Sequence, residues 1–164
     1  MIEKKKYRSK KASQKEIHLY TLLGESLSAV QILEDALSYA IVLKKTEPDQ
    51  KKEADDLLEK QRFYTFGKAI EVAKKESLLP KNLEIELSKL LIERNWLIHD
   101  SITSNKNDFK SDAYFSKLFE RIKPITTKAL KLQISIELDL IEYSKKKGID
   151  MSNVENEMNK HYEI

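Results

Sequence analysis

The chain has 164 residues, 40% of them hydrophobic and 35% charged, with a formal net charge of +3 and no cysteine. This length suffices for one domain that buries roughly two thirds of its unfolded surface, and the low content of Gly and Pro favours long helices over turn-rich β architecture. The absence of Cys excludes disulfides, thiolate nucleophiles and cysteine-based zinc sites. No apolar run reaches the roughly 18 residues of a membrane span, and the start of the chain lacks the apolar core of a secretion signal. We therefore expect a cytoplasmic protein without a membrane partner.

Residues 1–12 form a basic amino-terminal arm. Six positively charged residues lie in this arm and a seventh, Lys15, follows it; they are Lys4, Lys5, Lys6, Arg8, Lys10, Lys11 and Lys15. An arm of this kind either binds nucleic acid by releasing counterions or simply keeps the chain in solution, and the sequence leaves both interpretations open.

The first helix is predicted over residues 13–45. Apolar residues recur three or four positions apart from Ile17 to Leu43, which is the period of an amphipathic helix. Ser13 with Glu16 three residues later is a capping-box pattern at the start. Pro48 disfavours helical geometry in the residue before it and therefore ends the helix.

Two further core helices are predicted in the middle of the chain. Residues 51–60 are polar and lead into a second core helix at 65–76. Pro80 then forces a turn. A third core helix follows at 82–98, and a polar loop occupies 101–108.

The last long periodic stretch runs over residues 109–147. Pro124 lies inside it and should kink the helix or divide it in two, because proline removes a backbone hydrogen bond. Gly148 closes this stretch, and residues 149–164 form a tail that either frays or adds a short helix. Residues 13–148 are therefore expected to fold as an all-α antiparallel bundle of four to five helices, with long first and last members.

The third core helix has more apolar surface than one contact face requires. At about 100° per residue, one stripe contains Leu83, Leu87, Leu90, Leu91, Leu97 and Ile98. A neighbouring stripe contains Ile92, Asn95, Trp96 and His99. The second stripe could be enclosed within the bundle, but a contact with a second copy across a two-fold axis explains more, so we expect a homodimer.

Arg94, Asn95 and His99 introduce polar chemistry into this apolar helix. Metal-free cleavage of RNA needs a base for the 2′-hydroxyl proton and cations for the phosphoryl oxygens. His exchanges protons near neutral pH, and Arg presents a planar fork of donors to phosphate. His18 and His161 share no metal-ligand spacing with His99, so no metal and no cofactor are expected. On an ideal helix Arg94 and His99 differ by about 140°, so one chain should pair them poorly.

The segment RNWLIH, Arg94 to His99, resembles the R-x4-6-H signature of the HEPN superfamily, in which Asn often follows the Arg. Residues 63–100 are similar to the two central helices of a HEPN domain, and the flanks agree in architecture. The resemblance implies a homodimer with a composite cleft, metal-independent endoribonuclease activity, and a toxin–antitoxin, abortive-infection or phage-defence role with a cognate antitoxin or activator protein. Carried over by position, His99 would transfer the proton, Arg94 would bind the phosphate, and Asn95 would position groups.

Four other residues are candidates for binding substrate. Trp96 could stack on a base, although an interface or core anchor is its commoner role. Arg121 and Lys123 precede the proline and could form a phosphate-binding rim or a solvated face. Ser101 stands two residues after the histidine, where family members controlled by nucleotidylation commonly have Tyr, so that form of control is not expected here.

Three functional hypotheses remain at the level of sequence. The first is the HEPN-type endoribonuclease acting on RNA. The second is a non-catalytic helical module that binds nucleotide, RNA or a protein partner through the same groove, and the third is a plain dimeric bundle without a ligand. Glu34 or Asp35 of the first helix could orient the histidine, or both could be solvated acids.

Overall fold

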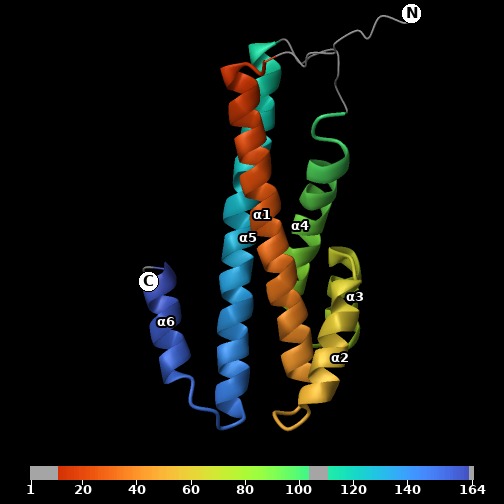
Figure 1. The fold of residues 1–164 in the computed structure, drawn as a ribbon, viewed down its shortest axis with the longest axis vertical. Coiled ribbons are helices and arrows are strands. Elements are labelled where there is room, and N and C mark those ends of the chain that lie inside the picture. The colour runs from red at the N-terminus through yellow and green to blue at the C-terminus, as the bar shows by residue number, and fades with distance from the viewer. Residues whose placement is uncertain (1–10, 104–110, 163–164) are drawn as a thin grey trace, which may run out of the picture.

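The computed structural model describes residues 11–103 and 111–162, and in this part of the chain helices joined by short connections occur without any strand. The helices are α1 (Gln14–Lys45), α2 (Lys51–Arg62), α3 (Phe66–Lys75), α4 (Lys81–His99), α5 (Asp112–Lys146) and α6 (Ser152–Tyr162). Figure 1 shows α1 and α5 running side by side along the length of the molecule, with α4, α3 and α2 on one side of this pair and α6 on the other. The expected all-α bundle is confirmed.

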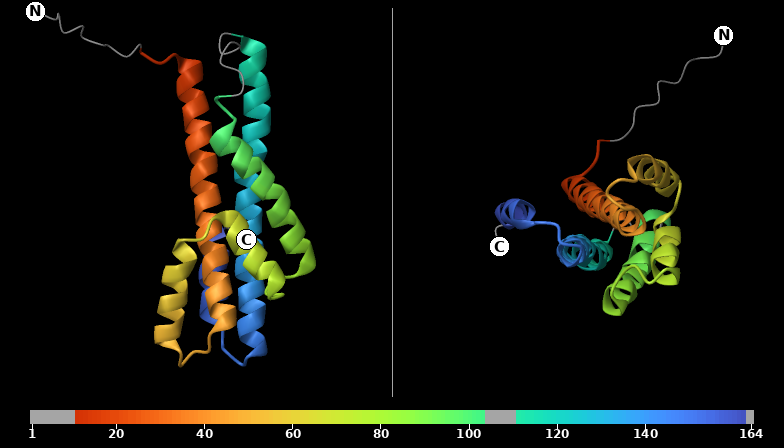
Figure 2. Two further views of the ribbon diagram at one scale, coloured as in Figure 1. Left: turned by 90° about the vertical axis from the view of Figure 1, so that its right-hand side faces the viewer. Right: turned by 90° about the horizontal axis from the view of Figure 1, so that it is seen from below.

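The two longest helices, α1 and α5, run parallel to each other. Their first turns meet where Lys15 pairs with Asp112, and their far ends meet where Lys147 pairs with Glu47. Successive helices from α1 to α5 reverse direction at each turn (Figures 1 and 2). The polar segment after α1 forms a complete helix, α2, and this additional reversal makes the fifth helix parallel to the first.

Local sequence signals set several helix ends. The Ser13 side chain accepts from the Glu16 backbone while the Glu16 carboxylate accepts from the Ser13 backbone, so the predicted capping box begins α1. Thr65 caps α3 through its side chain, which accepts from the Lys68 backbone. Gly148 follows α5 with φ of 80°, a left-handed conformation that glycine adopts without a steric penalty.

Pro124 does not divide α5, contrary to one of the two expected outcomes, because the helix continues from Asp112 to Lys146 around it. Its neighbours are held by α1: the buried Ser26 hydroxyl lies 3.4 Å from the Ile122 carbonyl oxygen and 2.8 Å from the Thr126 hydroxyl. Tertiary contacts with α1 thus support α5 where the proline removes a backbone donor.

Apolar side chains of α1 and α5 supply most of the core. They include Leu19, Leu33, Leu37, Ile41, Ile122 and Ile136, none of which is exposed by even one percent. Burial of large aliphatic side chains contributes about 1.5–3 kcal/mol each to folding. Leu87 and Leu90 of α4 and Phe66 of α3 complete the core on the other side.

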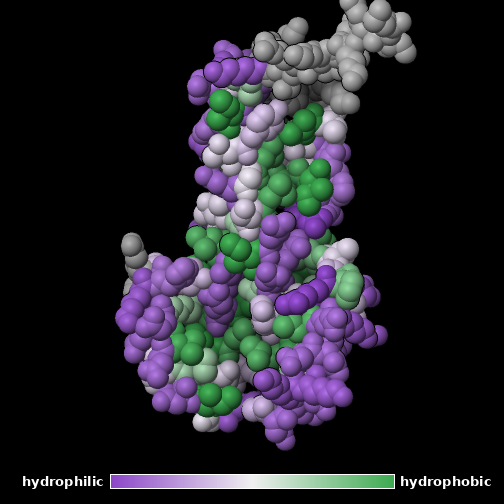
Figure 3. Space-filling model, viewed as in Figure 1, coloured by the Kyte–Doolittle hydropathy of each residue, from purple (hydrophilic) through white to green (hydrophobic). Residues whose placement is uncertain are grey.

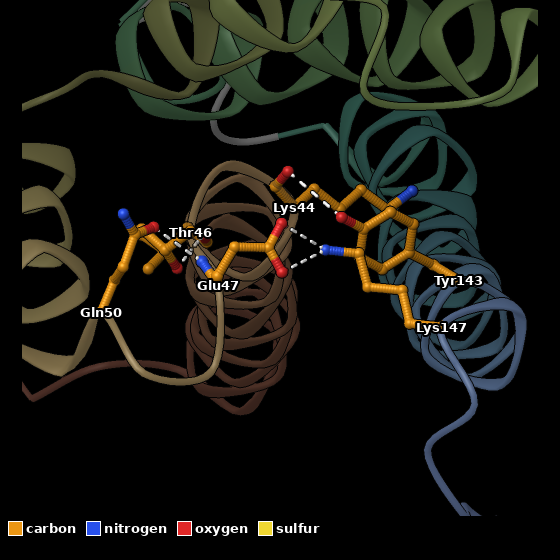
Figure 4. A network of polar contacts seen from close by, with 7 residues as sticks. Lys44, Thr46, Glu47, Gln50, Tyr143 and Lys147 are labelled. Atoms are coloured by element: carbon orange, nitrogen blue, oxygen red, sulfur yellow. Dashed lines mark hydrogen bonds and ion pairs between the residues drawn. The ribbon is translucent and has the colours of Figure 1, made fainter.

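Polar contacts join the ends of α1 and α5 that lie farthest from the first turns (Figure 4). The Tyr143 hydroxyl donates to the Lys44 carbonyl oxygen at 3.3 Å, and Lys147 Nζ donates to both carboxylate oxygens of Glu47 at 2.8 and 2.9 Å. The Lys44 side chain also pairs with Asp139 and donates to the Leu78 carbonyl oxygen at 2.7 Å. These contacts connect α1, α5 and the turn before α4.

The carboxy-terminal tail forms a short helix, α6, which was one of the two expected alternatives; the other was a frayed end. Met158 is its buried residue. The Tyr162 hydroxyl donates to Glu137 Oε2 at 2.8 Å, and Gln133 Nε2 donates to the Tyr162 oxygen at 2.9 Å. Lys145 of α5 also pairs with Glu155 of α6 at 2.5 Å. These polar contacts and one buried side chain attach α6 to α5.

Within the described residues, α1 is the one helix long and apolar enough to cross a membrane by length and composition. The sequence expectation concerned an uninterrupted apolar run of that length, and α1 meets the length and composition criteria although Glu25, Glu34 and Asp35 interrupt its apolar residues. A helix in the core of a bundle also meets these criteria of length and composition, and α1 packs Leu33, Leu37 and Ile41 into the core. On the face that includes the outer side of α1, Figure 3 shows apolar patches separated by hydrophilic surface.

Candidate functional site

The two apolar stripes of α4 have different environments. Leu83, Leu87, Leu90 and Leu97 are buried in the bundle, whereas Ile92 of the second stripe is 65% exposed. Asn95 and His99 are exposed on that side as well. Of the first stripe, Leu91 is half-buried and Ile98 is 44% exposed. One chain therefore leaves Ile92, Asn95 and His99 of the second stripe open, whereas Trp96 is half-buried against the core.

Arg94 is the polar residue of α4 that faces the bundle. Its Nε donates to Glu34 Oε1 of α1 at 3.1 Å, and its Nη1 donates to Asn95 Oδ1 at 3.3 Å. Burial raises the pKa of Glu34, and the Arg94 guanidinium opposes that shift. The sequence suggested Glu34 as a partner of the histidine, but in this chain it pairs with the arginine.

His99 is the last residue of α4, and its side chain is exposed. Its backbone oxygen accepts from the Thr103 hydroxyl at 2.7 Å. No hydrogen bond of the imidazole ring occurs among residues 11–103 and 111–162. Asn95 precedes it by one helical turn and lies on the same side. The imidazole is thus available to a molecule outside the bundle.

Trp96 and Arg121 lie together at the seam between α4 and α5. The guanidinium carbon of Arg121 is 3.8 Å from the centre of the Trp96 ring, in cation–π geometry. Arg121 also donates through Nε and Nη2 to the Glu93 carboxylate, at 2.9 and 3.3 Å. Glu93 was not a candidate from the sequence, and only the tertiary pairing of the two helices identifies it.

Ser101 and Lys123 occupy contrasting positions. Ser101 is 5% exposed, and its hydroxyl donates to the Leu97 carbonyl oxygen at 2.6 Å. Contact with a substrate would require this hydroxyl to leave its bond. Lys123 is exposed and lines an open groove with Lys128, Lys131 and Glu86. Of the candidates on α4 and α5, the structure brings Arg94 to Asn95 and Trp96 to Arg121.

The described residues contain no group of three or more His, Asp and Glu side chains arranged to hold a metal ion. The fold and site together define the protein as an all-α helical bundle with a polar motif at the end of α4. No protein-family model, no curated protein and no solved structure matches this chain. The HEPN resemblance therefore rests on the residues that suggested it.

Proposed function

We propose that this chain is a metal-independent endoribonuclease of the HEPN type, acting on RNA in the cytoplasm as a homodimer. In this proposal it is a toxin or phage-defence effector under the control of an antitoxin or activator protein. The supporting features are the Arg94–Asn95–His99 motif and its place at the end of a bundle helix with an open apolar stripe.

One observation carries this proposal: the Arg94 guanidinium extends to Asn95 Oδ1 at 3.3 Å. Asn95 shares its side of α4 with His99, one turn further on. Although the backbone directions of Arg94 and His99 diverge, Asn95 connects the arginine to the side on which the imidazole is exposed.

The chemistry assigns one role to each residue of the motif. His99 takes the proton of a ribose 2′-hydroxyl, whose oxygen attacks the adjacent phosphorus. A new P–O2′ bond forms and the P–O5′ bond breaks, leaving a 2′,3′-cyclic phosphate and, after protonation, a 5′-hydroxyl. Arg94 stabilises the charge on the phosphoryl oxygens, and Asn95 orients the guanidinium. Trp96, Ser101, Arg121 and Lys123 remain candidates for substrate contacts.

The dimer in this proposal uses the second stripe of α4. Ile92 of that stripe is 65% exposed, and Ile85, two helical turns before it, is 46% exposed, so both add apolar surface on the α4 side that leads toward His99. An isologous contact would bring two copies of the motif together. Ile92→Lys should therefore reduce the molecular mass measured by light scattering, whereas Ile32→Lys on the exposed side of α1 should not. Equal masses for both variants would remove the dimer from the proposal.

The test of catalysis compares the purified protein with His99→Ala on a mixed RNA pool in excess EDTA. His161→Ala serves as the matched control, because His161 is an exposed histidine on α6. We expect cleavage with 2′,3′-cyclic phosphate ends from the native protein and from His161→Ala, and none from His99→Ala at unchanged mass and helicity. Cleavage by His99→Ala at the native rate would refute the assignment.

A non-catalytic binding module is the second candidate function. The observation that favours it is that Glu34 already pairs with the Arg94 guanidinium, which gives the arginine a structural role. In that case RNA, nucleotide or a protein partner would bind without cleavage. Retention of a labelled RNA by the native protein, with no cleavage by any variant, would favour this candidate.

A further inference from the structure

An open groove lies where α5 passes α4, and we call it the basic groove. Its volume is about 610 Å³, and the described residues that line it are Glu86 of α4 with Lys123, Pro124, Thr127, Lys128 and Lys131 of α5. Lysines thus outnumber the single acid in this lining. An excess of positive charge at an open surface attracts anionic partners.

Ion pairs do not cancel the charge of the basic groove. Two lysines share the Glu86 carboxylate: Lys89 Nζ donates to Oε1 at 2.6 Å, and Lys128 Nζ lies 3.2 Å from Oε2. These hydrogen bonds, that from Lys89 first, hold the pKa of Glu86 below its ordinary value, so the acid stays ionised between two ammonium groups. Lys123 and Lys131 are exposed and form no ion pair within residues 11–103 and 111–162.

The charged residues beside the groove leave the balance positive. Arg121 and Glu93 pair with each other and add no net charge. Glu120 is exposed one helical turn before Pro124 and offsets one lysine. Lys123, Lys131 and the second ammonium group at Glu86 still outnumber that acid.

The positive groups are spaced along α5 rather than gathered at one point. Lys123, Thr127 and Lys131 follow one another at intervals of four residues, so they lie on one side of the helix. The eight residues from the first lysine to the last correspond to roughly 12 Å. Thr127 is exposed between them, and its hydroxyl is a group that binds phosphate oxygens. A row of this kind suits the successive phosphates of a strand better than one small anion.

The composition of the groove favours nucleic acid over the other polyanions. Pro124 is the one apolar side chain among the described lining residues. Protein interfaces usually centre on aromatic or other large anchors, and membrane-binding surfaces insert Trp, Phe or Leu. Interfaces with nucleic acid are more polar and more positively charged, which agrees with a lining of lysines and one threonine.

Two ion pairs establish the order of the groove and the motif along the bundle. Lys128 of α5 pairs with Glu86 of α4. Seven residues earlier in α5, Arg121 pairs with Glu93, which is seven residues later in α4. The basic groove, Arg121 and His99 therefore follow one another toward the carboxy end of α4. Thirteen residues separate Glu86 from His99, roughly 20 Å along the helix.

We propose that the basic groove binds the sugar–phosphate backbone of an RNA strand, beyond the nucleotides that reach His99. Lys123 and Lys131 contact separate phosphates, and Thr127 donates to a phosphate oxygen between them. This inference rests on the proposed function for the identity of the substrate, but binding in the groove requires no cleavage. Because the contacts are with phosphates, binding is independent of base sequence.

Binding is measured without cleavage on a fluorescent 2′-O-methyl oligouridylate, whose riboses lack the nucleophilic hydroxyl. The groove variant combines Lys123→Gln with Lys131→Gln. We expect its dissociation constant to be at least tenfold higher at low salt. The slope of log affinity against log salt should become shallower by about 1.4, because each phosphate contact with a single strand contributes about 0.7.

The matched control combines Lys52→Gln with Lys75→Gln, which removes the same charge from exposed positions of α2 and α3 outside the groove. It should bind the oligonucleotide within twofold of the native affinity. Equal weakening of the two variants, native affinity in the groove variant, or no binding by the native chain would overturn the proposal.

Two competitors distinguish nucleic acid from other anions. An oligoglutamate of equal charge and vesicles that contain phosphatidylserine both lack a sugar–phosphate backbone. We expect neither to displace the oligonucleotide at an equal concentration of charge. Displacement by oligoglutamate would reassign the groove to an acidic protein partner, and displacement by the vesicles would reassign it to a membrane; either result would overturn the proposal.

Cleavage kinetics separate this inference from the proposed function. The dinucleotide UpA is too short to extend the roughly 20 Å from His99 to the groove. We therefore expect the groove variant to raise KM for a long RNA at least tenfold more than it raises KM for UpA. Native binding and native KM in the groove variant would refute the inference and leave the catalytic assignment standing. Cleavage by His99→Ala would refute that assignment and leave binding in the groove intact.

Discussion

Nε of Arg94 lies 3.1 Å from Oε1 of Glu34, which joins α4 to the middle of α1. Both side chains are about three-quarters buried, with exposures of 22% and 26%. The same guanidinium reaches Asn95. One arginine thus has a structural contact on one side and the proposed active-site contact on the other, and experiments must separate the two.

A double-mutant cycle measures the structural part. We expect Glu34→Gln and Arg94→Gln each to lower the free energy of unfolding, with a coupling energy of about 0.5–1 kcal/mol, because the pair is only partly shielded from water. Urea denaturation of the native chain, both single variants and the double variant gives the value. The exposed pair Lys68–Glu71 within α3 is the control and should couple more weakly. A coupling energy of zero would show that Arg94 has no structural role.

The stacking of Arg121 on Trp96 can be followed by fluorescence, since Trp96 is the one tryptophan of the chain. Arg121→Ala uncovers the ring, so we expect the emission maximum to move to longer wavelength and stability to fall by about 0.5–1 kcal/mol. Lys123→Ala, on the same helix and also exposed, should leave the emission unchanged. Identical spectra for the two variants would contradict the cation–π contact.

Lys44 should matter far more to stability than Lys15, although each forms an ion pair between α1 and α5. The Lys44 side chain is 8% exposed, whereas that of Lys15 is 54% exposed. Lys44→Ala leaves the partly buried Asp139 unpaired and should cost about 2–3 kcal/mol. Lys15→Ala should cost at most about 0.5 kcal/mol. Chemical denaturation of both variants tests this, and similar costs would argue against burial as the cause.

Pro124→Ala should stabilise the protein. The helix continues through this position and the proline side chain is exposed, so its replacement restores a backbone donor without loss of packing. A gain of about 1–3 kcal/mol is expected. Pro80→Ala is the comparison, because Pro80 lies at the start of α4 with φ of −57°, where proline is compatible with the backbone. That variant should lose up to about 1 kcal/mol. Destabilisation by Pro124→Ala would mean that α5 depends on the proline.

Alkaline pH should weaken the attachment of α6. Burial, and then the hydrogen bond to Glu137, raises the pKa of Tyr162 to about 12 from the ordinary value of 10.0. The folded chain therefore holds this proton more tightly than the unfolded chain does. The contribution to stability is complete below about pH 10 and is lost as the pH rises from 10 to about 12. Absorbance at alkaline pH should show a late-titrating tyrosine in the native protein that is missing in Tyr162→Phe, while Tyr20→Phe, in the exposed part of α1, should retain it.

The sequence predicted what depends on local signals. The Ser13–Glu16 capping box, the break at Pro80 and the end of α5 at Gly148 follow from residues within a few positions of one another. Helical geometry also predicted that Arg94 and His99 diverge, and the structure places Arg94 toward α1 and His99 in solvent. These features need no knowledge of which helices are neighbours.

Features that depend on tertiary pairing could not be predicted. Residues 51–62 form a helix in which only Gln61 is buried, so their apolar pattern is weak. Because this helix adds one reversal of chain direction, α5 runs parallel to α1, and that direction could be predicted only if the helix was recognised. Glu34, Glu93 and Asp139 resemble any solvated acid in sequence. Their roles follow from α4 packing on α1 and from α5 packing on α4 and α1.

Along the bundle, the charges around Lys44, Glu47 and Lys147 lie more than one Debye length from the end of α4 that carries His99. Ten residues of α1 separate Glu34 from Lys44, roughly 15 Å at ~1.5 Å per residue, and α4 carries His99 further in the opposite direction. In 0.1 M salt the Debye length is about 10 Å. Charge changes around Lys44, Glu47 and Lys147 are therefore screened from the end of α4 that carries His99.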